Sequence, residues 1–289
     1  MKEVDISMQD YHADTARPSK SMLSDLLDRP STYYKKYVAP LEEREQKKSA
    51  KHFRDGDLVH CKVHEPKEFS SRYHVVDVSS RATKTFKQTV LGTDKICITS
   101  SEYNNASYMA DALWNNKQAR AYLELAGKAE RTFYYTDPET GIELKARPDF
   151  ITDDSVFVLD TKTARSIDPF DFIRDADSFK YWLSPEIINN AVESVRGIKP
   201  QAYVFLCVEN KGEKKPDTAI YYADFDFLEL GEIKLKQALQ TLKQCRESGH
   251  WPAFDQPIPL GLPGYRQREL ERLREQQAST YLEEIQHVS

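Results

Sequence analysis

The sequence lacks the features that mark membrane, secreted and zinc-ribbon proteins. No apolar run approaches the roughly 20 residues that a bilayer crossing needs, and residues 1–5 contain neither the basic nor the apolar segment of a signal peptide. The cysteines at positions 61, 97, 207 and 245 form no C-x-x-C pair, which argues against a zinc ribbon or an iron–sulfur cluster. We therefore expect a cytoplasmic protein with reduced cysteines and no membrane partner.

An excess of positive charge is also absent. Lysine and arginine together number 41 against 46 aspartates and glutamates, so the formal net charge is −5. Proteins that coat nucleic acid through bulk electrostatics neutralise several phosphates with Lys and Arg, so the net charge argues against this class. Two stretches, 47–54 and 81–87, interleave cations with aromatic residues, and each is either part of a local basic channel or a solvated loop.

The hydrophobic pattern changes character along the chain. Helical spacing dominates residues 1–126, whereas strand-like alternation and apolar runs dominate the following segment. A stretch at 70–99 is polar and predicts loops. The expected strands lie at 132–136, 142–151, 156–161, 202–208 and 219–225, and the expected helices beside them at 184–197 and 227–245.

These elements predict an α/β fold with a central mixed β-sheet flanked by helices. We expect residues 1–255 to form one domain, with a helical N-terminal part at 1–126 and a core at 127–255. A linker with prolines and glycines and a charged helix then occupy 256–289. That helix packs either on the body of the protein or on another subunit.

Two short runs carry the candidate chemistry. The first is A-R-P-D-F at 146–150, and the second is L-D-T-K-T at 159–163, directly after an apolar run. Strand alternation places Asp160 and Lys162 on one face and Thr161 on the other. Carboxylate oxygens bind divalent cations, and positive charge stabilises a phosphodiester under attack by water. The runs favour metal-dependent phosphodiester cleavage, and the alternative is a structural ion-pair cluster at a sheet edge.

These runs resemble the signature of PD-(D/E)xK nucleases, and in particular the RecE (exonuclease VIII) branch of phage-type recombination exonucleases. The resemblance spans residues 19–254 and implies a restriction-endonuclease-like core. An ordered set of motifs is more specific than any one of them. The further motifs are G-D-L-V-H at 56–60, E-P at 65–66, G-I-K-P-Q-A-Y at 197–203 and W-P at 251–252.

The resemblance also implies a site. Lys162 would orient or deprotonate the attacking water, or stabilise charge on the phosphate. Mg²⁺ is the implied cofactor, with Mn²⁺ as a substitute, and the side chains that hold it would be catalytic together with Lys162. The implied metal ligands are Asp149, Asp160, the Thr161 backbone carbonyl, Glu130 and His60.

Two of these residues have other interpretations. Glu130 is alternatively a solvated charge at a strand edge, and His60 is alternatively a hydrogen-bonded core histidine. His60 and His64 have the i, i+4 spacing of zinc hydrolases. However, the order is not H-E-x-x-H, and Pro66 stops the helix, so we interpret His64 as structural and disfavour zinc.

The chain departs from the resemblance at one motif. Where these nucleases carry a helical glutamine and a partner tyrosine, this sequence has Ser184 and Ile188. The change concerns the positioning of the DNA end more than metal binding, because the metal ligands are all retained. Arg147, which precedes Pro148, either contacts phosphate or sets the exit of its strand.

The resemblance implies processive, Mg²⁺-dependent 5′-to-3′ degradation of one strand of duplex DNA. Such an enzyme would act at DNA ends as a homo-oligomeric ring and leave 3′ overhangs for a single-strand-annealing, RecT-like partner. One alternative is a related PD-(D/E)xK nuclease that cuts internally or prefers single strands. The other is a non-catalytic protein that binds DNA ends or a partner protein on the same fold.

Overall fold

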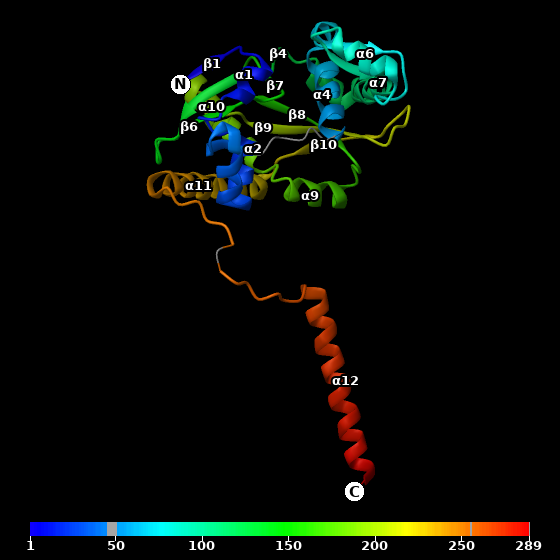
Figure 1. The fold of residues 1–289 in the computed structure, drawn as a ribbon, viewed down its shortest axis with the longest axis vertical. Coiled ribbons are helices and arrows are strands. Elements are labelled where there is room, and N and C mark those ends of the chain that lie inside the picture. The colour runs from blue at the N-terminus through cyan, green and yellow to red at the C-terminus, as the bar shows by residue number, and fades with distance from the viewer. Residues whose placement is uncertain (45–50, 255, 289) are drawn as a thin grey trace. The chain divides into compact units, whose positions relative to one another are not determined.

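The computed structural model describes residues 1–44, 51–254 and 256–288, with side chains for 1–44, 55–254 and 256–277. The chain divides into two units, Met1–Trp251 and Pro252–Ser289 (Figure 1), and each is described by itself. None of the helices in the described residues has an apolar stretch of the length that a membrane crossing requires. The basic stretch at 47–54 lies outside the described side chains.

The strands of the described residues form three sheets. The largest has the order β10-β9-β8-β7-β4, in which β8 and β9 run parallel and the other pairs run antiparallel. The second has the order β1-β5-β6, and β2 pairs with β3 in a small parallel sheet. The bounds are β1 Lys2–Val4, β2 Tyr73–Val76, β3 Ile96–Thr99, β4 Gly127–Ala129, β5 Thr132–Thr136, β6 Glu143–Ala146, β7 Phe150–Thr152, β8 Phe157–Ala164, β9 Ala202–Glu209 and β10 Thr218–Tyr222.

Helices precede, separate and follow these strands. A single π-helical turn at Tyr34–Val38 and short 3-10 turns at Leu41–Glu43 and Pro66–Glu68 connect some of them. The α-helices are α1 Met8–Ala13, α2 Lys20–Asp28, α3 Pro30–Tyr33, α4 Lys51–His64, α5 Phe69–Arg72, α6 Lys84–Leu91, α7 Ser100–Asn115, α8 Lys117–Leu123, α9 Pro169–Ser178, α10 Leu183–Arg196, α11 Phe225–Ser248 and α12 Gly264–Val288.

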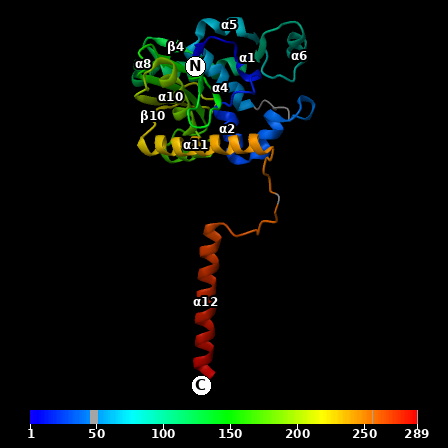
Figure 2. The same cartoon turned by 90° about the vertical axis from the view of Figure 1, so that its left-hand side faces the viewer.

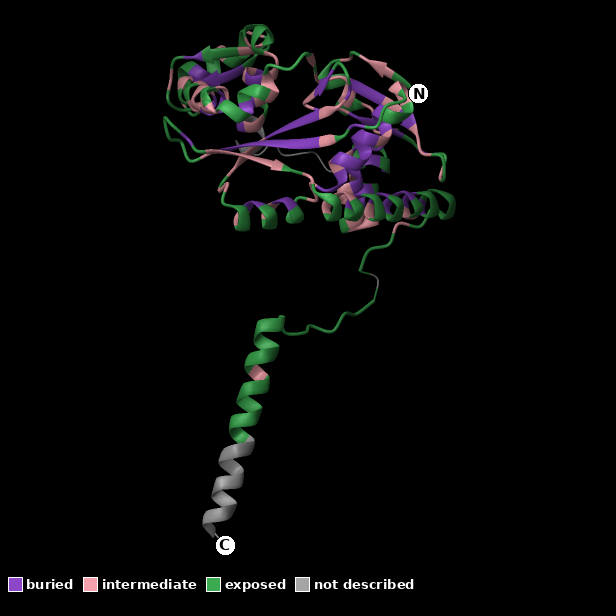
Figure 3. Cartoon of the chain, turned by 180° about the vertical axis from the view of Figure 1, so that it is seen from behind, coloured by how far each residue is buried: buried purple, intermediate pink, exposed green. Residues whose placement is uncertain are grey.

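Strands β8 and β9 are buried on both faces, and the two faces belong to different cores. Side chains point alternately to opposite faces of a strand, so Val158 joins the core built on α2, α10 and α11, whereas Leu159 joins the core built on α4 and α7. Along β9, Tyr203 and Phe205 join the first core and Val204 the second. Figure 3 shows the resulting buried strands, and Figure 2 shows α2 beside α11. The fold is a mixed α/β architecture with a central mixed sheet flanked by helices.

Three sequence-based predictions of secondary structure were wrong. The strand expected at 142–151 is two strands, β6 and β7, in different sheets, because Pro148 cannot donate a ladder hydrogen bond and restricts the residue before it. The stretch at 70–99 is not merely loop, since β2, α6 and β3 enclose a small core of Val76, Phe86 and Cys97. Helix α10 begins at Leu183 rather than after a Ser184 cap.

Helices α10 and α11 approach closely at Gly231. A Cβ atom at this position would lie 2.2 Å from the carbonyl oxygen of Trp182, which caps α10. Trp182 also donates through its indole nitrogen to Asp177 at 3.2 Å. The contact therefore fixes the chain between α9 and α10, which borders the candidate site described below.

Replacing Gly231 with alanine is expected to destabilise the protein. Alanine favours a helix by up to about 1 kcal/mol over glycine, but overpacking against a backbone atom costs about 1–3 kcal/mol, so the steric term wins. Urea unfolding followed by circular dichroism measures the difference. Gly261→Ala is the control, because a Cβ atom there meets nothing within 4 Å. A Gly231→Ala protein more stable than the wild type would contradict the close approach.

Candidate active site

The backbone of Thr161 on β8 organises the candidate site. Strand β7 pairs with β8 only at Phe150 and Ile151, so the edge of β8 beyond them is left for side chains. The Thr161 N–H donates to Asp149 Oδ2 at 2.7 Å. Asp149 lies immediately before β7, in the chain that leaves β6 through Pro148. The break at Pro148 thus turns a backbone edge into a carboxylate-binding position.

Helix α4 brings two histidines to the same residue. The Nε2 atom of His60 donates to the Thr161 carbonyl oxygen at 2.5 Å, and its Nδ1 atom lies 3.2 Å from Asp149 Oδ2. His64 contacts the Thr161 hydroxyl at 2.8 Å and stacks on the Phe150 ring. His60 therefore faces the carboxylates, while His64 packs as a structural residue, which agrees with the sequence-based interpretation.

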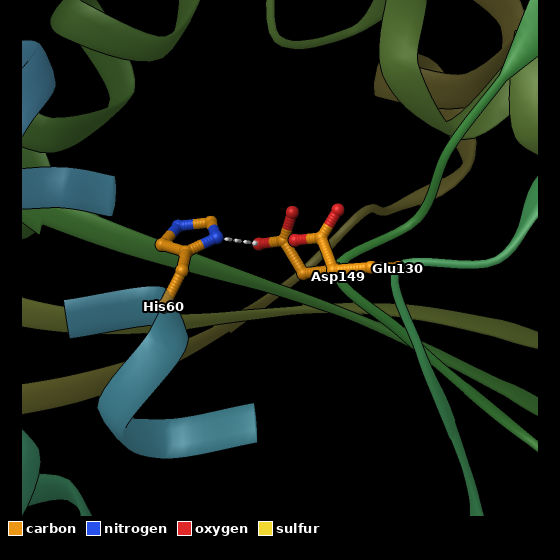
Figure 4. A group of neighbouring side chains, drawn as sticks. All are labelled: His60, Glu130 and Asp149. Carbon is orange, nitrogen blue, oxygen red and sulfur yellow. Dashed lines mark ion pairs between the residues drawn. The ribbon is translucent and has the colours of Figure 1, made fainter. Parts of the chain in front are cut away.

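Glu130 completes a group of three potential ligands. Its backbone N–H donates to the Asp149 carbonyl at 3.1 Å, and its φ of 53° is in the left-handed region, which a non-glycine residue adopts at a cost in energy. Ligand atoms of His60, Glu130 and Asp149 all lie within 4.8 Å of one another. Figure 4 shows the three side chains converging, with the His60–Asp149 ion pair dashed.

Asp160 lies one residue away and has different partners. Its buried carboxylate pairs with the Lys162 ammonium and accepts a hydrogen bond of 2.7 Å from the Tyr203 hydroxyl. Ser184 hydrogen-bonds to Tyr203 in turn. The structure thus brings Asp160 and Lys162 together on one face of β8, as expected, but Asp160 lies outside the group of three. Ser184 contacts the site through Tyr203, and Ile188 is buried in the core.

The charges of the first group depend on each other. Burial lowers the pKa of His60, but the Asp149 carboxylate outweighs it and raises the pKa to about 9. Burial raises the pKa of Asp149, but His60 and Lys162 hold it well below its ordinary range. Burial and the charge of Asp149 raise the pKa of Glu130 to about 8. The carboxylates therefore attract positive charge, and protonated His60 supplies part of it.

The second group is also polarised. Burial lowers the pKa of Lys162, but Asp160 and Asp149 outweigh it and raise the pKa above its ordinary value. Burial raises the pKa of Asp160, with Lys162 opposing. Lys162 is consequently held as an ammonium ion at neutral pH. His64 differs, because burial lowers its pKa to about 4 and keeps the ring neutral.

The residues fit a divalent cation. The donors are two carboxylates, one imidazole and, at Thr161, one backbone carbonyl, a predominantly oxygen set that suits Mg²⁺ or Mn²⁺. Burial and the neighbouring Asp149 carboxylate raise the pKa of Glu130, so a bound cation would favour its ionised form. Neutral His64 is turned to a hydroxyl and a ring, so the zinc interpretation of the His60–His64 pair gains no support.

Two cationic elements from the sequence analysis serve the scaffold. Arg147 donates to the Thr132 hydroxyl at 2.7 Å and to the Ile6 carbonyl at 2.8 Å, so it ties the N-terminal segment to the sheet. In the stretch at 81–87, Arg81 pairs with Glu102 at 2.8 Å and lies over the Phe86 ring. These contacts assign structural roles to both arginines.

A family model and a solved structure each match most of this chain. The family model for the PDDEXK-like domain of unknown function DUF3799 matches residues 19–255. The chain belongs to the DUF3799 family. A crystal structure of a putative exonuclease from Eubacterium rectale superposes on this DUF3799 protein with a TM-score of 0.58 and 14% identity, covering 89% of this chain and 97% of that one. At this identity the match shows the fold alone.

A second solved structure matches less well. The crystal structure of SSO0001 covers 75% of this chain and 83% of that one at 12% identity, and its TM-score of 0.26 carries no argument. No curated protein is detectably similar in sequence. The family and the fold together place the DUF3799 protein in the PD-(D/E)xK nuclease superfamily, whose members typically depend on divalent metals.

Sequence reasoning missed Tyr203 as a residue of the site. Its signal was present, because Tyr203 belongs to the G-I-K-P-Q-A-Y motif at 197–203 on an expected strand. Its partner was not deducible without the parallel pairing of β8 and β9, in which Asp160 lies opposite Phe205. That register places Tyr203 on the same face of the sheet as Asp160.

Neutralising Glu130 is expected to stabilise the metal-free protein near neutral pH. Because the folded-state pKa of about 8 exceeds the ordinary value of 4.5, stability falls as pH rises through this interval. At pH 7.5, Glu130→Gln should therefore gain about 1–3 kcal/mol over the wild type, and the gain should vanish below pH 4.5. Denaturant unfolding in EDTA measures it, with exposed Glu139→Gln as the control. Equal or lower stability of Glu130→Gln at pH 7.5 would contradict the electrostatic account.

Proposed function

We propose that this protein is a Mg²⁺-dependent 5′-to-3′ exonuclease that degrades one strand of duplex DNA and leaves 3′ single-stranded overhangs. The proposal rests on one observation: two groups of side chains both adjoin Thr161 of β8. The group of three, His60, Glu130 and Asp149, lies beside the pair Asp160–Lys162. Membership of the PD-(D/E)xK superfamily supports phosphodiester hydrolysis as the chemistry.

The metal would be held by Asp149, Glu130 and His60, with the Thr161 carbonyl and Asp160 as neighbouring donors. When bound, a divalent cation polarises the phosphoryl oxygens and lowers the pKa of water. For His60 to act as a ligand, it must give up the proton that the metal-free carboxylates stabilise. Metal binding is thus expected to release protons, as is general for imidazole ligands.

Lys162 acts as a fixed positive charge in this proposal. Because the neighbouring carboxylates hold its pKa above the ordinary value, the ammonium is a poor proton acceptor at neutral pH. Of the roles implied by the resemblance, stabilising charge on the phosphate or orienting water fits this state, and deprotonating water does not.

The polarity of cleavage and the downstream partner are proposed from the resemblance to RecE. Action at DNA ends, a homo-oligomeric ring and a single-strand-annealing partner complete that proposal. Ser184 occupies the position where the related nucleases carry a glutamine, and it is linked to Asp160 through Tyr203. This substitution supports a modified handling of the DNA end.

Duplex DNA carrying a label at its 5′ end or its 3′ end tests the activity. With Mg²⁺, wild-type protein should release the 5′ label first from linear DNA and leave closed circles intact, and EDTA should abolish release. Asp160→Ala should fall to the level seen with EDTA. Asp153→Ala is the matched control, since Asp153 is exposed in the turn before β8.

Each other result contradicts a defined part of the proposal. Cleavage of closed circles would replace exonuclease with endonuclease activity, and release of the 3′ label first would reverse the polarity. Metal binding without hydrolysis would favour a non-catalytic DNA-end-binding protein. Full activity of Asp160→Ala would remove Asp160 from the site.

Tyr203 is expected to position Asp160 for the metal. Tyr203→Phe removes the hydroxyl that donates to Asp160 at 2.7 Å, and the loss of such a supporting hydrogen bond typically weakens metal binding by about 10–100-fold. Titration calorimetry with Mn²⁺ measures the affinity in the absence of DNA. Tyr221→Phe is the control, because that hydroxyl donates to the Ile167 carbonyl instead. Unchanged Mn²⁺ affinity in Tyr203→Phe would show that Asp160 needs no such support.

A further inference from the structure

A second lysine, Lys20, contacts the turn between α9 and α10 at the border of the site. Lys180 in this turn has a φ of 52°, a left-handed conformation that costs energy for a residue with a side chain. The carbonyl of Phe179, one residue earlier, accepts a hydrogen bond of 2.7 Å from Lys20 Nζ. Lys20 is the first residue of α2, so this hydrogen bond joins the turn to the start of that helix.

Tyr181, the next residue of the turn, connects Lys20 to the catalytic candidates. The Nζ atom of Lys20 lies 5.3 Å from the centre of the Tyr181 ring, and the Nζ atom of Lys162 lies 4.9 Å from it. Two ammonium groups from different elements thus share one aromatic ring. Like charges repel, and the Asp160 carboxylate that pairs with Lys162 offsets this repulsion only in part, so the arrangement favours a further anion near the ring.

Lys20 differs from the other lysines around it. Lys162 pairs with Asp160, and Lys180 pairs with Asp28 at 2.6 Å. Among the described residues, no carboxylate lies within ion-pair distance of Lys20. Burial and the charge of Lys162 lower the pKa of Lys20 to about 8.

The position of Lys20 on its helix is also unfavourable. A cation in the first turn of a helix opposes the helix dipole, at a cost of about 0.3–1 kcal/mol for exposed positions. The hydrogen bond to the Phe179 carbonyl and the contact with the Tyr181 ring offset part of this cost, but no carboxylate among the described residues does. The fold therefore retains a costly cation at the border of the site.

We propose that Lys20 binds a backbone phosphate of the DNA substrate, next to the phosphate that Lys162 faces. This inference rests on the proposed function and extends it to a residue of α2. A phosphate oxygen supplies the negative partner that Lys20 lacks among the described residues, and it relieves the repulsion between the two ammonium groups. The contact carries no base specificity, since phosphates are the same in every sequence.

The salt dependence of DNA binding tests this contact. Fluorescence anisotropy of a labelled duplex, with Ca²⁺ in place of Mg²⁺ and a series of KCl concentrations, gives the slope of log K against log salt. Each phosphate contact contributes about 0.9 to that slope on duplex DNA. Lys20→Met should lower its magnitude by about 0.9, and Lys20→Arg should preserve it. Lys236→Met on α11 removes the same charge from an exposed helix pair and should leave the slope unchanged.

Two further measurements separate binding from a structural role. In Mg²⁺, Lys20→Met should raise KM with a smaller effect on kcat. Lys20→Arg, which keeps the charge, should keep the KM of the wild type. An unchanged salt slope, or an unchanged KM, in Lys20→Met would overturn the assignment of Lys20. Wild-type protein that binds the duplex but never cleaves it would instead overturn the proposed nuclease function and leave the phosphate contact standing.

Discussion

The candidate site depends on one backbone unit, that of Thr161. Its N–H holds the Asp149 carboxylate and its carbonyl accepts from His60. Both groups are free for side chains because β7 is short and pairs with β8 only at two positions. A strand that continued past Asp149 would satisfy these groups with backbone and leave no place for the acid and the imidazole.

Charge balance is the second constraint. Asp149, Asp160 and Glu130 come together in a largely buried region, and such a cluster is stable only with compensating cations. Protonated His60 and Lys162 supply that compensation in the metal-free protein. The same residues would hold a divalent cation, whose charge would replace that of the imidazolium proton. Binding and stability are thereby opposed at Glu130, whose charge is unfavourable until a cation is present.

The sequence pattern predicted some elements of the fold correctly and others wrongly. The buried run before Asp160 and the alternation of Lys162 with Thr161 predicted the faces of β8 correctly, because strand geometry is local. The single strand expected across Pro148 was wrong, since whether β6 and β7 share a sheet depends on their partners. The helix and strands within 70–99 escaped notice because their apolar residues are few and their core is small.

Sequence alone determined which residues are candidates for the chemistry: Asp160 and Lys162 on β8, Asp149 and Glu130 beside neighbouring strands, and His60 on α4. Tertiary structure alone decided how they divide. It placed His60, Glu130 and Asp149 in one group, whereas Asp160 pairs with Lys162 and accepts a hydrogen bond from Tyr203. It also brought Lys20, far away in the chain, to the same aromatic ring as Lys162. The reason is physical: residue type and strand periodicity are local properties, whereas the distance between side chains of α2, α4, β8 and β9 is fixed only when their faces pack against one another.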